Sequence, residues 1–323
     1  MRNETYLQNS ERRDVGTWLE NTTSQDPILG RLFPQLRRLA TSEAPVLLLG
    51  EPGSGRELAA RAVHNLSGRA AHPFVVIDCG DFSDPLIEAE LLGIDGGTPP
   101  HKMGIFEQAG SGTVLLAEVG ELPARLQGAL IQLLERHELK RLNSSTPVQA
   151  RARVIASTCV DLRPRVAAAL FREDLYQRLS AEKLELPPLR DRAEDIRPLA
   201  RHFLERCCGH LPRAPRDLTP EAEAALRAYS WPGNLHELRE VVEEAALRAR
   251  GERIAVEDLP ERVRGEQRGG PLPSLREVEI RHIERVLQEA RGNQRRASRI
   301  LGISRWSLSR RLRKYGLQPR AEQ

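Results

Sequence analysis

The residues with the clearest capacity for chemistry form one glycine-rich stretch. Glycines let successive backbone N–H groups turn toward phosphate oxygens, and the start of a following helix adds partial positive charge. The usual pattern, G-x-x-x-x-G-K-[ST], places its lysine on the β- and γ-phosphates and its hydroxyl on magnesium. Here Arg56 takes the lysine position and Glu57 the hydroxyl position. The stretch predicts a nucleotide-binding loop with altered chemistry, although a glycine-rich turn without a ligand fits these residues alone about equally well. Its members are Gly50, Glu51, Pro52, Gly53, Ser54, Gly55, Arg56 and Glu57.

A second stretch ends an apolar run on an acidic side chain. Residues 113–116 are followed by Ala117 and Glu118. Downstream of a phosphate loop, this is where a P-loop ATPase holds magnesium and polarises water. Glu118 is therefore the candidate catalytic carboxylate. No metal-ligand set is predicted, because the four cysteines lack both a C-x-x-C framework and metal-site spacing.

The elements that must position these residues follow from alternating apolar and amphipathic segments. Five short apolar runs read as strands: 46–49, 74–77, 113–116, 154–156 and the weaker 184–186. Strands separated by helical patterns predict an α/β fold, with a parallel sheet covered by helices on both faces.

The rest of the chain divides by composition. We expect a flexible leader over 1–24, too short for a regulatory domain, and the α/β subdomain over 25–190. Residues 191–262 show helical segments and no strand-like run, residues 263–273 form a Gly/Pro-rich linker, and residues 274–318 form a separate all-α module. No apolar run approaches the roughly 20 residues that span a bilayer, and the first residues do not resemble a signal peptide. The sequence thus predicts a cytoplasmic protein with no membrane partner.

The last module carries most of the local positive charge. Basic residues recur from Arg291 to Lys314 without an acidic residue among them. A short helical pattern ends at the turn Gly302-Ile303, Ser304 caps the next helix, and that helix turns Leu308 inward. This pattern predicts a helix-turn-helix whose second helix enters a DNA major groove. The segment 275–290 has an apolar face wide enough to pack on a second copy as well, which predicts a dimer. The alternative is a basic three-helix bundle that only dimerises.

The candidate contacts to double-stranded DNA divide into two groups. The outer face of the second helix presents Arg305, Trp306, Ser309, Arg310 and Arg313, of which Arg305 and Arg310 are the first choices for base contacts. The residues expected to meet phosphates are Arg295, Arg296 and Arg299, together with Arg311 and Lys314.

Five motifs follow one another in a fixed order along the chain: residues 112–123, which include the acidic stretch above, and residues 154–158, 171–179, 186–192 and 231–239. With the glycine-rich loop, they resemble the AAA+ domain of the NtrC-type bacterial enhancer-binding proteins, which act with sigma-54 RNA polymerase. The resemblance covers about residues 26–262, and the last module is similar to the family's Fis-like DNA-binding domain. It implies an AAA+ P-loop sheet with a helical lid over 191–262, ATP as cofactor, RNA polymerase as partner and a hexamer formed through the AAA+ domain.

The departures from the family pattern concern its chemistry. The Walker A lysine falls on Arg56, the Walker B aspartate on Ala117, the asparagine that restrains the glutamate on Asp78, the sensor-1 asparagine on Cys159 and the sensor-2 arginine on His236. Glu118 and the two candidate arginine fingers, Arg172 and Arg178, are retained. Since charge stabilisation and positioning are nearly all of phosphoryl-transfer catalysis, we expect a pseudo-ATPase. Its catalytic residues are then vestigial, ATP or ADP binds weakly, and a magnesium requirement is doubtful.

The segment expected to contact sigma-54 also departs from the family. The segment between Gly93 and Gly104 is shorter than the corresponding loop of the family and lacks the family's sequence Gly-Ala-Phe-Thr-Gly-Ala. The leading hypothesis is a sequence-specific DNA-binding transcriptional regulator that neither hydrolyses ATP nor remodels sigma-54 polymerase. Two alternatives stay open: an ATP-hydrolysing sigma-54-dependent activator, and a subunit that modulates hexamers of an intact relative.

Overall fold

The computed structural model describes residues 29–81, 84–96, 101–208, 217–249 and 251–264, together with five positions of the last module. The chain divides into two compact units, residues 1–265 and 266–323. The expected leader over 1–24 and residues 265–273 of the expected linker lie outside the described residues. In the part of the chain that is described, no helix is long and apolar enough to cross a membrane.

One parallel sheet organises the first unit. Among the described residues it contains five strands in the order β2 (Phe74–Asp78), β5 (Thr113–Ala117), β8 (Arg153–Thr158), β1 (Val46–Leu49) and β9 (Glu182–Glu185). All five runs expected as strands are confirmed, although β9 begins two residues earlier than the apolar pattern indicated. Since the strands are parallel, their carboxyl ends lie along one edge of the sheet.

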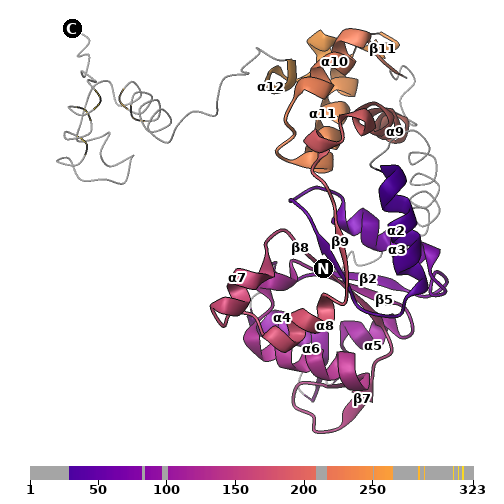
Figure 1. Ribbon diagram of the computed structural model, residues 1–323, viewed down its shortest axis with the longest axis vertical. Coiled ribbons are helices and arrows are strands. Elements are labelled where there is room, and N and C mark those ends of the chain that lie inside the picture. Colours follow the sequence, from indigo (N-terminus) through magenta and orange to yellow (C-terminus); the bar gives the residue numbers. More distant parts are fainter. Residues whose placement is uncertain are drawn as a thin grey trace. The chain divides into compact units, whose positions relative to one another are not determined.

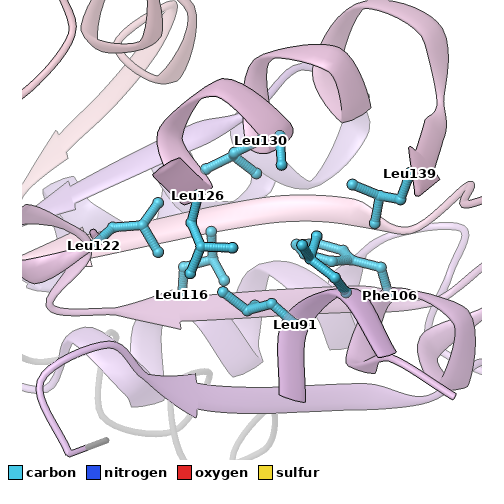
Figure 2. Close-up of a pocket in the computed structure, with 9 residues that line it drawn as sticks. Leu91, Phe106, Leu116, Leu122, Leu126, Leu130 and Leu139 are labelled. Atoms are coloured by element: carbon cyan, nitrogen blue, oxygen red, sulfur yellow. The ribbon is translucent and has the colours of Figure 1, made fainter. Parts of the chain in front are cut away.

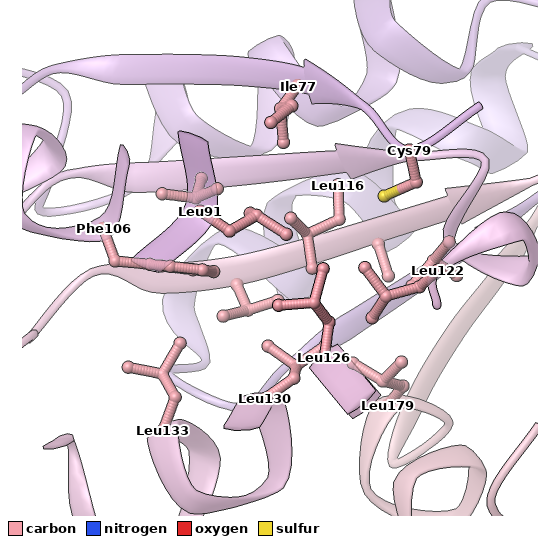
Figure 3. Packing of buried hydrophobic residues seen from close by; sticks show 14 of the residues in the cluster. Ile77, Cys79, Leu91, Phe106, Leu116, Leu122, Leu126, Leu130, Leu133 and Leu179 are labelled. Atoms are coloured by element: carbon pink, nitrogen blue, oxygen red, sulfur yellow. The ribbon is translucent and has the colours of Figure 1, made fainter. Parts of the chain in front are cut away.

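Alternating side chains bury both faces of this sheet. Leu48 and Leu115 pack against α2 (Leu29–Thr41) and α3 (Arg56–Leu66) on one face. Leu47 and Leu116 point to the other face, which is covered by α4 (Asp84–Leu92), α5 (Ile105–Ala109), α6 (Ala124–Arg136), α7 (Leu162–Ala167) and α8 (Glu173–Leu179). Figure 1 shows these two helical layers, and Figure 3 shows Leu116 packed among leucines of the second layer, including Leu91, Leu126 and Leu130. The predicted α/β architecture is confirmed.

Two short hairpins were not predicted. β3 (Gly93–Asp95) pairs with β4 (His101–Met103), and β6 (Glu138–Lys140) pairs with β7 (Pro147–Gln149), both antiparallel. The hairpins join at Leu142, which accepts the Asp95 N–H at 2.9 Å and donates to the Gly93 carbonyl at 2.9 Å. Their strands are three residues long and largely polar, so they give no apolar alternation that sequence reasoning could use.

The described residues between 189 and 264 form a helical lid. It contains α9 (Ile196–Cys208), α10 (Pro220–Ala228), α11 (Asn234–Arg248) and α12 (Glu261–Arg264), with short 3-10 turns at Leu189–Asp191, Ala193–Asp195 and Val256–Asp258. Trp231 is fully buried in its core and donates its indole N–H to the Leu226 carbonyl at 2.8 Å. The expectation of a strand-free lid was wrong in one detail. Two-residue strands β10 (Asp217–Leu218) and β11 (Arg253–Ile254) pair in parallel, too short for an apolar pattern to reveal.

The second unit is described at five helical positions. Ile283, Leu287, Leu308 and Leu312 are buried, and Tyr315 is half-buried. Leu308 was expected to face inward from the last helix, in agreement with its burial. The candidate DNA contacts Arg295, Arg296, Arg299, Arg305, Trp306, Ser309, Arg310 and Arg313 lie outside the described residues.

Candidate nucleotide site

The glycine-rich loop joins β1 to α3 at the carboxyl edge of the sheet. Gly53 and Gly55 adopt left-handed backbone conformations, with φ of 72° and 99°. The turn is closed by the Ser54 N–H, which donates to the Glu51 carbonyl at 3.1 Å, and the first bond of α3 joins Ala59 N–H to the Gly55 carbonyl at 2.9 Å. The amides preceding that bond have no acceptor within the helix. The strand–loop–helix arrangement expected for a phosphate loop is therefore present.

The back of the loop is packed against the lid. A Cβ added to Gly53 would lie 2.2 Å from the Gly233 carbonyl oxygen, so only glycine fits there. Leu235 N–H donates to the Gly53 carbonyl at 2.9 Å, and the Asn234 amide donates to the Pro52 carbonyl at 3.0 Å. The lid thus fixes the loop through its backbone, independently of any ligand.

Glu51 completes this contact as an anchor to the lid. The two terminal nitrogens of Arg190 donate to its carboxylate at 2.8 and 2.6 Å, and Asn234 adds a third hydrogen bond at 3.2 Å. These bonds, first those from Arg190 and then that from Asn234, lower the pKa of Glu51 from 4.5 to about 2. Arg192 also donates to the Ser54 carbonyl at 2.8 Å. We call Glu51, Arg190, Arg192 and Asn234 the lid clasp.

Sequence reasoning named the segments that hold Arg190 and Asn234 but gave these residues no role. Asn234 lies 183 positions from Glu51, so no local pattern predicts their contact. The only sequence signal for these two residues was that each lies in one of the motifs that follow a fixed order along the chain.

The front of the loop faces β5 and carries an ion pair. The Arg56 guanidinium donates to Glu118 Oε1 through Nη2 at 2.5 Å. The other carboxylate oxygen, Oε2, accepts the Cys159 backbone N–H at 3.0 Å. Glu118 itself adopts a left-handed backbone conformation, with φ of 47°, which is strained for a residue with a side chain. The site thus holds both oxygens of its candidate base.

These contacts weaken Glu118 as a base. Burial raises the pKa of this carboxyl, while the hydrogen bonds from Arg56 and Cys159 lower it, and the balance leaves the pKa below its usual value. A carboxylate with a depressed pKa has less tendency to take a proton from water. In this structure Glu118 is the counterion of Arg56.

The neighbouring positions offer little for magnesium. Asp78 and Ala117 are paired in register across β2 and β5, and Asp78 Oδ1 accepts the Gly80 N–H at 2.8 Å. The methyl of Ala117 cannot coordinate a metal. Within the described residues, no group of three or more His, Cys, Asp and Glu side chains could hold a metal ion.

The buried Cys79 thiol lies beside the two carboxylates and is not reactive. Burial, with the charges of Asp78 and Glu118 as further causes, raises its pKa to about 12. It therefore stays a protonated packing group at physiological pH.

The other candidate residues have partners away from the loop. His236 lies on α11, largely exposed, with Nε2 3.1 Å from a Glu240 oxygen. Arg172 donates to Asp174 at 3.0 and 2.7 Å, and Arg178 pairs with Glu135. The structure thus brings Glu118 to the 50–57 loop, while Arg172 and Arg178 form ion pairs with residues outside that loop.

A gap between α6 and the sheet is not a second site. Figure 2 shows it enclosed by side chains such as Leu91, Phe106, Leu116 and Leu126. Its volume is about 10 Å³ and its lining is apolar. This is about the space of one water molecule without polar partners for it, so it reflects core packing.

Three family descriptions match successive parts of the chain. Residues 22–185 match the Sigma-54 interaction domain, residues 190–274 the AAA+ ATPase lid domain, and residues 274–315 the Bacterial regulatory protein, Fis family. The chain belongs to the NtrC-type family of sigma-54-dependent transcriptional regulators. The AAA+ fold and the Fis-type helix-turn-helix, a DNA-binding domain, expected from the motifs are confirmed.

Similar proteins agree with this assignment. The regulatory protein AtoC of Escherichia coli strain K12 is 39% identical over 312 residues, covering 92% of this chain and 68% of AtoC. The sigma54-dependent transcriptional activator SfnR of Pseudomonas putida is 44% identical over 239 residues, covering 73% of this chain and 65% of SfnR. The chain thus spans about two thirds of the length of these relatives.

The fold is also similar to that of NtrX from Brucella abortus. The crystal structure of NtrX in complex with ADP superposes with a TM-score of 0.68 at 30% identity, covering 90% of this chain and 68% of NtrX. A second structure, in complex with ATP, gives a TM-score of 0.66.

Proposed function

We propose that this regulator binds double-stranded DNA and a nucleotide, and does not hydrolyse ATP at a catalytically useful rate. The observation that carries the proposal is the contact between Arg56 and Glu118, at 2.5 Å. In this contact the cation of the loop and the candidate base pair with each other. We further propose the domain limits 25–190, 191–262 and 274–318, with a leader over 1–24 and a linker over 263–273.

The chemical argument rests on charge. Phosphoryl transfer needs cations along the β- and γ-phosphates and a positioned nucleophile. Arg56 commits one edge of its guanidinium to Glu118, and a planar guanidinium does not substitute for the compact ammonium of lysine. Ala117 supplies no ligand for magnesium, and Glu118 has a depressed pKa. Each of these changes removes either charge stabilisation of the transition state or the basicity of the residue that would activate water.

Nucleotide binding is better supported than hydrolysis. The left-handed glycines and the start of α3 retain the backbone geometry that binds phosphate. NtrX, with the same fold, has been solved with ADP and with ATP. The proposed ligand is ATP or ADP, bound weakly and with little dependence on magnesium.

Assembly is the proposed readout of this nucleotide. If Arg172 and Arg178 reach a nucleotide on a neighbouring subunit, they must first leave Asp174 and Glu135, with which they pair in one protomer. A ligand that bridges subunits favours the assembled state. The proposed self-association is a dimer through the last module and a hexamer through the AAA+ domain. Sedimentation with and without ATP tests this step, and binding without any change in assembly removes it.

Contact with RNA polymerase is proposed without remodelling. The family matches include the Sigma-54 interaction domain, but β3 and β4 are each only three residues long and the hairpin lacks the Gly-Ala-Phe-Thr-Gly-Ala sequence. Without hydrolysis and without that contact, we expect no opening of a sigma-54 polymerase complex.

DNA binding is tested with two arginines of the last module. Arg310→Ala should reduce discrimination between operator and random DNA by about 1–3 kcal/mol, because Arg310 is assigned to a base edge. Arg296→Ala, the matched control assigned to a phosphate, should weaken both complexes about equally. Affinity should fall steeply with salt through counterion release. Equal weakening by Arg310→Ala would refute the assigned recognition face.

Hydrolysis is tested by steady-state ATP turnover with magnesium. The protein should release phosphate no faster than its Glu118→Ala variant. A magnesium-dependent rate that disappears in the variant would support an ATP-hydrolysing activator instead. Co-purification with hexamers of an intact relative would support the modulating-subunit alternative.

A further inference from the structure

The Arg56 guanidinium has one nitrogen bound to Glu118 and one that makes no hydrogen bond within the part of the chain that the structure describes. Nη2 is bound to Glu118 at 2.5 Å. Nη1 is buried and, among the described residues, makes no hydrogen bond. The side chain is only 11% exposed, so bulk water does not solvate it fully. A buried cationic donor without an acceptor favours binding of an anion beside it.

A second donor without a partner lies in the same loop. Ser54 is 1% exposed, and its hydroxyl has no hydrogen-bond partner within the described part of the chain. This hydroxyl faces Gly50 across the loop, since a Cβ added to Gly50 would lie 2.6 Å from Ser54 Oγ. The loop therefore contains two buried donors besides its backbone amides.

The position of Glu118 limits how many phosphates this arrangement accepts. In loops of this pattern the residue at the Arg56 position reaches the β- and γ-phosphates. The carboxylate held by Arg56 thus occupies the γ-phosphate end of the site. A third phosphate would place negative charge beside Glu118, and among the described residues the cation paired with Glu118 is Arg56, which would then face two anionic groups. Ala117 provides no ligand for a Mg²⁺ ion that could neutralise this charge.

We propose that this site selects a nucleoside diphosphate over the corresponding triphosphate and binds it without magnesium. The proposal rests on the proposed function and specifies its ligand. The β-phosphate accepts hydrogen bonds from the loop amides and from the free nitrogen of Arg56, while the Arg56–Glu118 pair stays closed. The diphosphate state is then the resting state of the site, and ATP has to compete with Glu118 for Arg56.

The test is calorimetric titration of the full chain with ADP and with ATP, each in EDTA and in excess Mg²⁺. ADP should bind about tenfold more tightly than ATP in EDTA, because the triphosphate adds charge next to a carboxylate. Magnesium should change the ADP affinity less than about twofold, since Ala117 provides no metal ligand and, among the described residues, no group of three or more His, Cys, Asp and Glu side chains could hold a metal ion. Equal or tighter ATP binding, an absolute need for magnesium, or no binding of ADP overturns the proposal.

Pyrophosphate and GDP serve as further titrants. Pyrophosphate should bind more weakly than ADP, and equal affinity would show an anion site that does not recognise a nucleoside. Titration with GDP and GTP alongside ADP and ATP tests whether the proposed preference holds for nucleoside diphosphates as a class. Tighter binding of GDP than of GTP would extend the preference for ADP to nucleoside diphosphates as a class, and equal or tighter binding of GTP would overturn the claim to the class.

Glu118→Gln is the diagnostic variant, because it removes the charge and keeps the shape. It should raise ATP affinity about tenfold and leave ADP affinity nearly unchanged, so that the selectivity disappears. Glu121→Gln is the matched control. Glu121 follows shortly after and pairs with Arg165 outside the site, so this change should preserve selectivity. Retained selectivity in Glu118→Gln would overturn the charge argument.

Phosphate release measured on the same preparations separates the two proposals. Diphosphate selectivity with rapid ATP hydrolysis would refute the non-hydrolysing function and leave the ligand assignment in place. No hydrolysis with equal ADP and ATP affinities would refute the ligand assignment alone.

Discussion

The two sides of the 50–57 loop differ in how completely their polar groups are satisfied. Toward the lid, Glu51 binds Arg190 and Asn234, and the Gly53 carbonyl accepts the Leu235 N–H. Toward the sheet, Arg56 has one contact with Glu118 and a buried nitrogen without a partner in the described part of the chain. The lid side has the features of a fixed scaffold, and the sheet side those of a ligand site in which the cation of the loop is paired with a carboxylate. On the proposed function, loop geometry and phosphoryl-transfer chemistry are separable in this fold.

The largest expected effect is on the free energy of unfolding and comes from a substitution that breaks the lid clasp. Asn234→Ala removes the hydrogen bonds to Pro52 and Glu51 and the acceptor of the Leu189 N–H at 2.7 Å, at a fully buried position. We expect the free energy of unfolding to fall by about 2–4 kcal/mol, because buried partners are left unsatisfied. Urea denaturation measures it.

Asn143→Ala is the matched control for that change. Asn143 and Asn234 both adopt left-handed backbone, with φ of 64° and 52°, but Asn143 is exposed. Its replacement should cost about 1 kcal/mol, from backbone strain alone. Equal losses in the two variants would mean that the clasp adds nothing beyond backbone conformation.

The next prediction concerns the sheet side. Ala117→Asp adds a carboxylate beside Asp78 and Glu118 and should make nucleotide binding magnesium-dependent by about tenfold, because hard carboxylate oxygens are magnesium's usual protein ligands. Ala117→Asn has similar size without the charge and should stay magnesium-independent. If the Asp variant also ignores magnesium, the missing carboxylate is not the cause of the altered site.

The smallest effect should appear in the pH dependence of stability. The pKa of Glu51 is lowered from 4.5 to about 2, first by the hydrogen bonds from Arg190 and then by that from Asn234. A depressed folded-state pKa gives stabilisation that is complete above about pH 4.5 and is lost as the pH falls toward 2. Glu51→Gln should remove this part of the slope in urea denaturation at stepped pH. An unchanged slope would show that the Glu51 contact to the lid is electrostatically neutral.

Much of the fold was predictable, because it depends on local patterns. The apolar runs at 46–49 and 113–116 locate β1 and β5, and the glycines between β1 and α3 locate the loop. The edge of the site was also predictable, since the carboxyl ends of parallel strands bring Glu118 and Cys159 together. The short hairpins were missed because strands of three polar residues carry no periodic signal.

The choice of partners at the site was not predictable from sequence. Arg56 and Glu118 are 62 positions apart, and nothing local shows that the guanidinium contacts the carboxylate instead of remaining open. The lid clasp likewise depends on contacts between the lid and the 50–57 loop, which lie far apart in the sequence. Residue types predicted altered chemistry at this site, which stays a prediction, and the structure supplied the contacts that these residues make.

The most direct test of the central claim is a single-turnover measurement. Excess protein is mixed with labelled ATP and magnesium, and ADP formation is followed for the protein and for its Glu118→Ala variant. The ion pair between Arg56 and Glu118 predicts the same slow conversion in both, because Glu118 acts as a counterion and not as a base. Rapid conversion that requires Glu118 and magnesium would contradict the account.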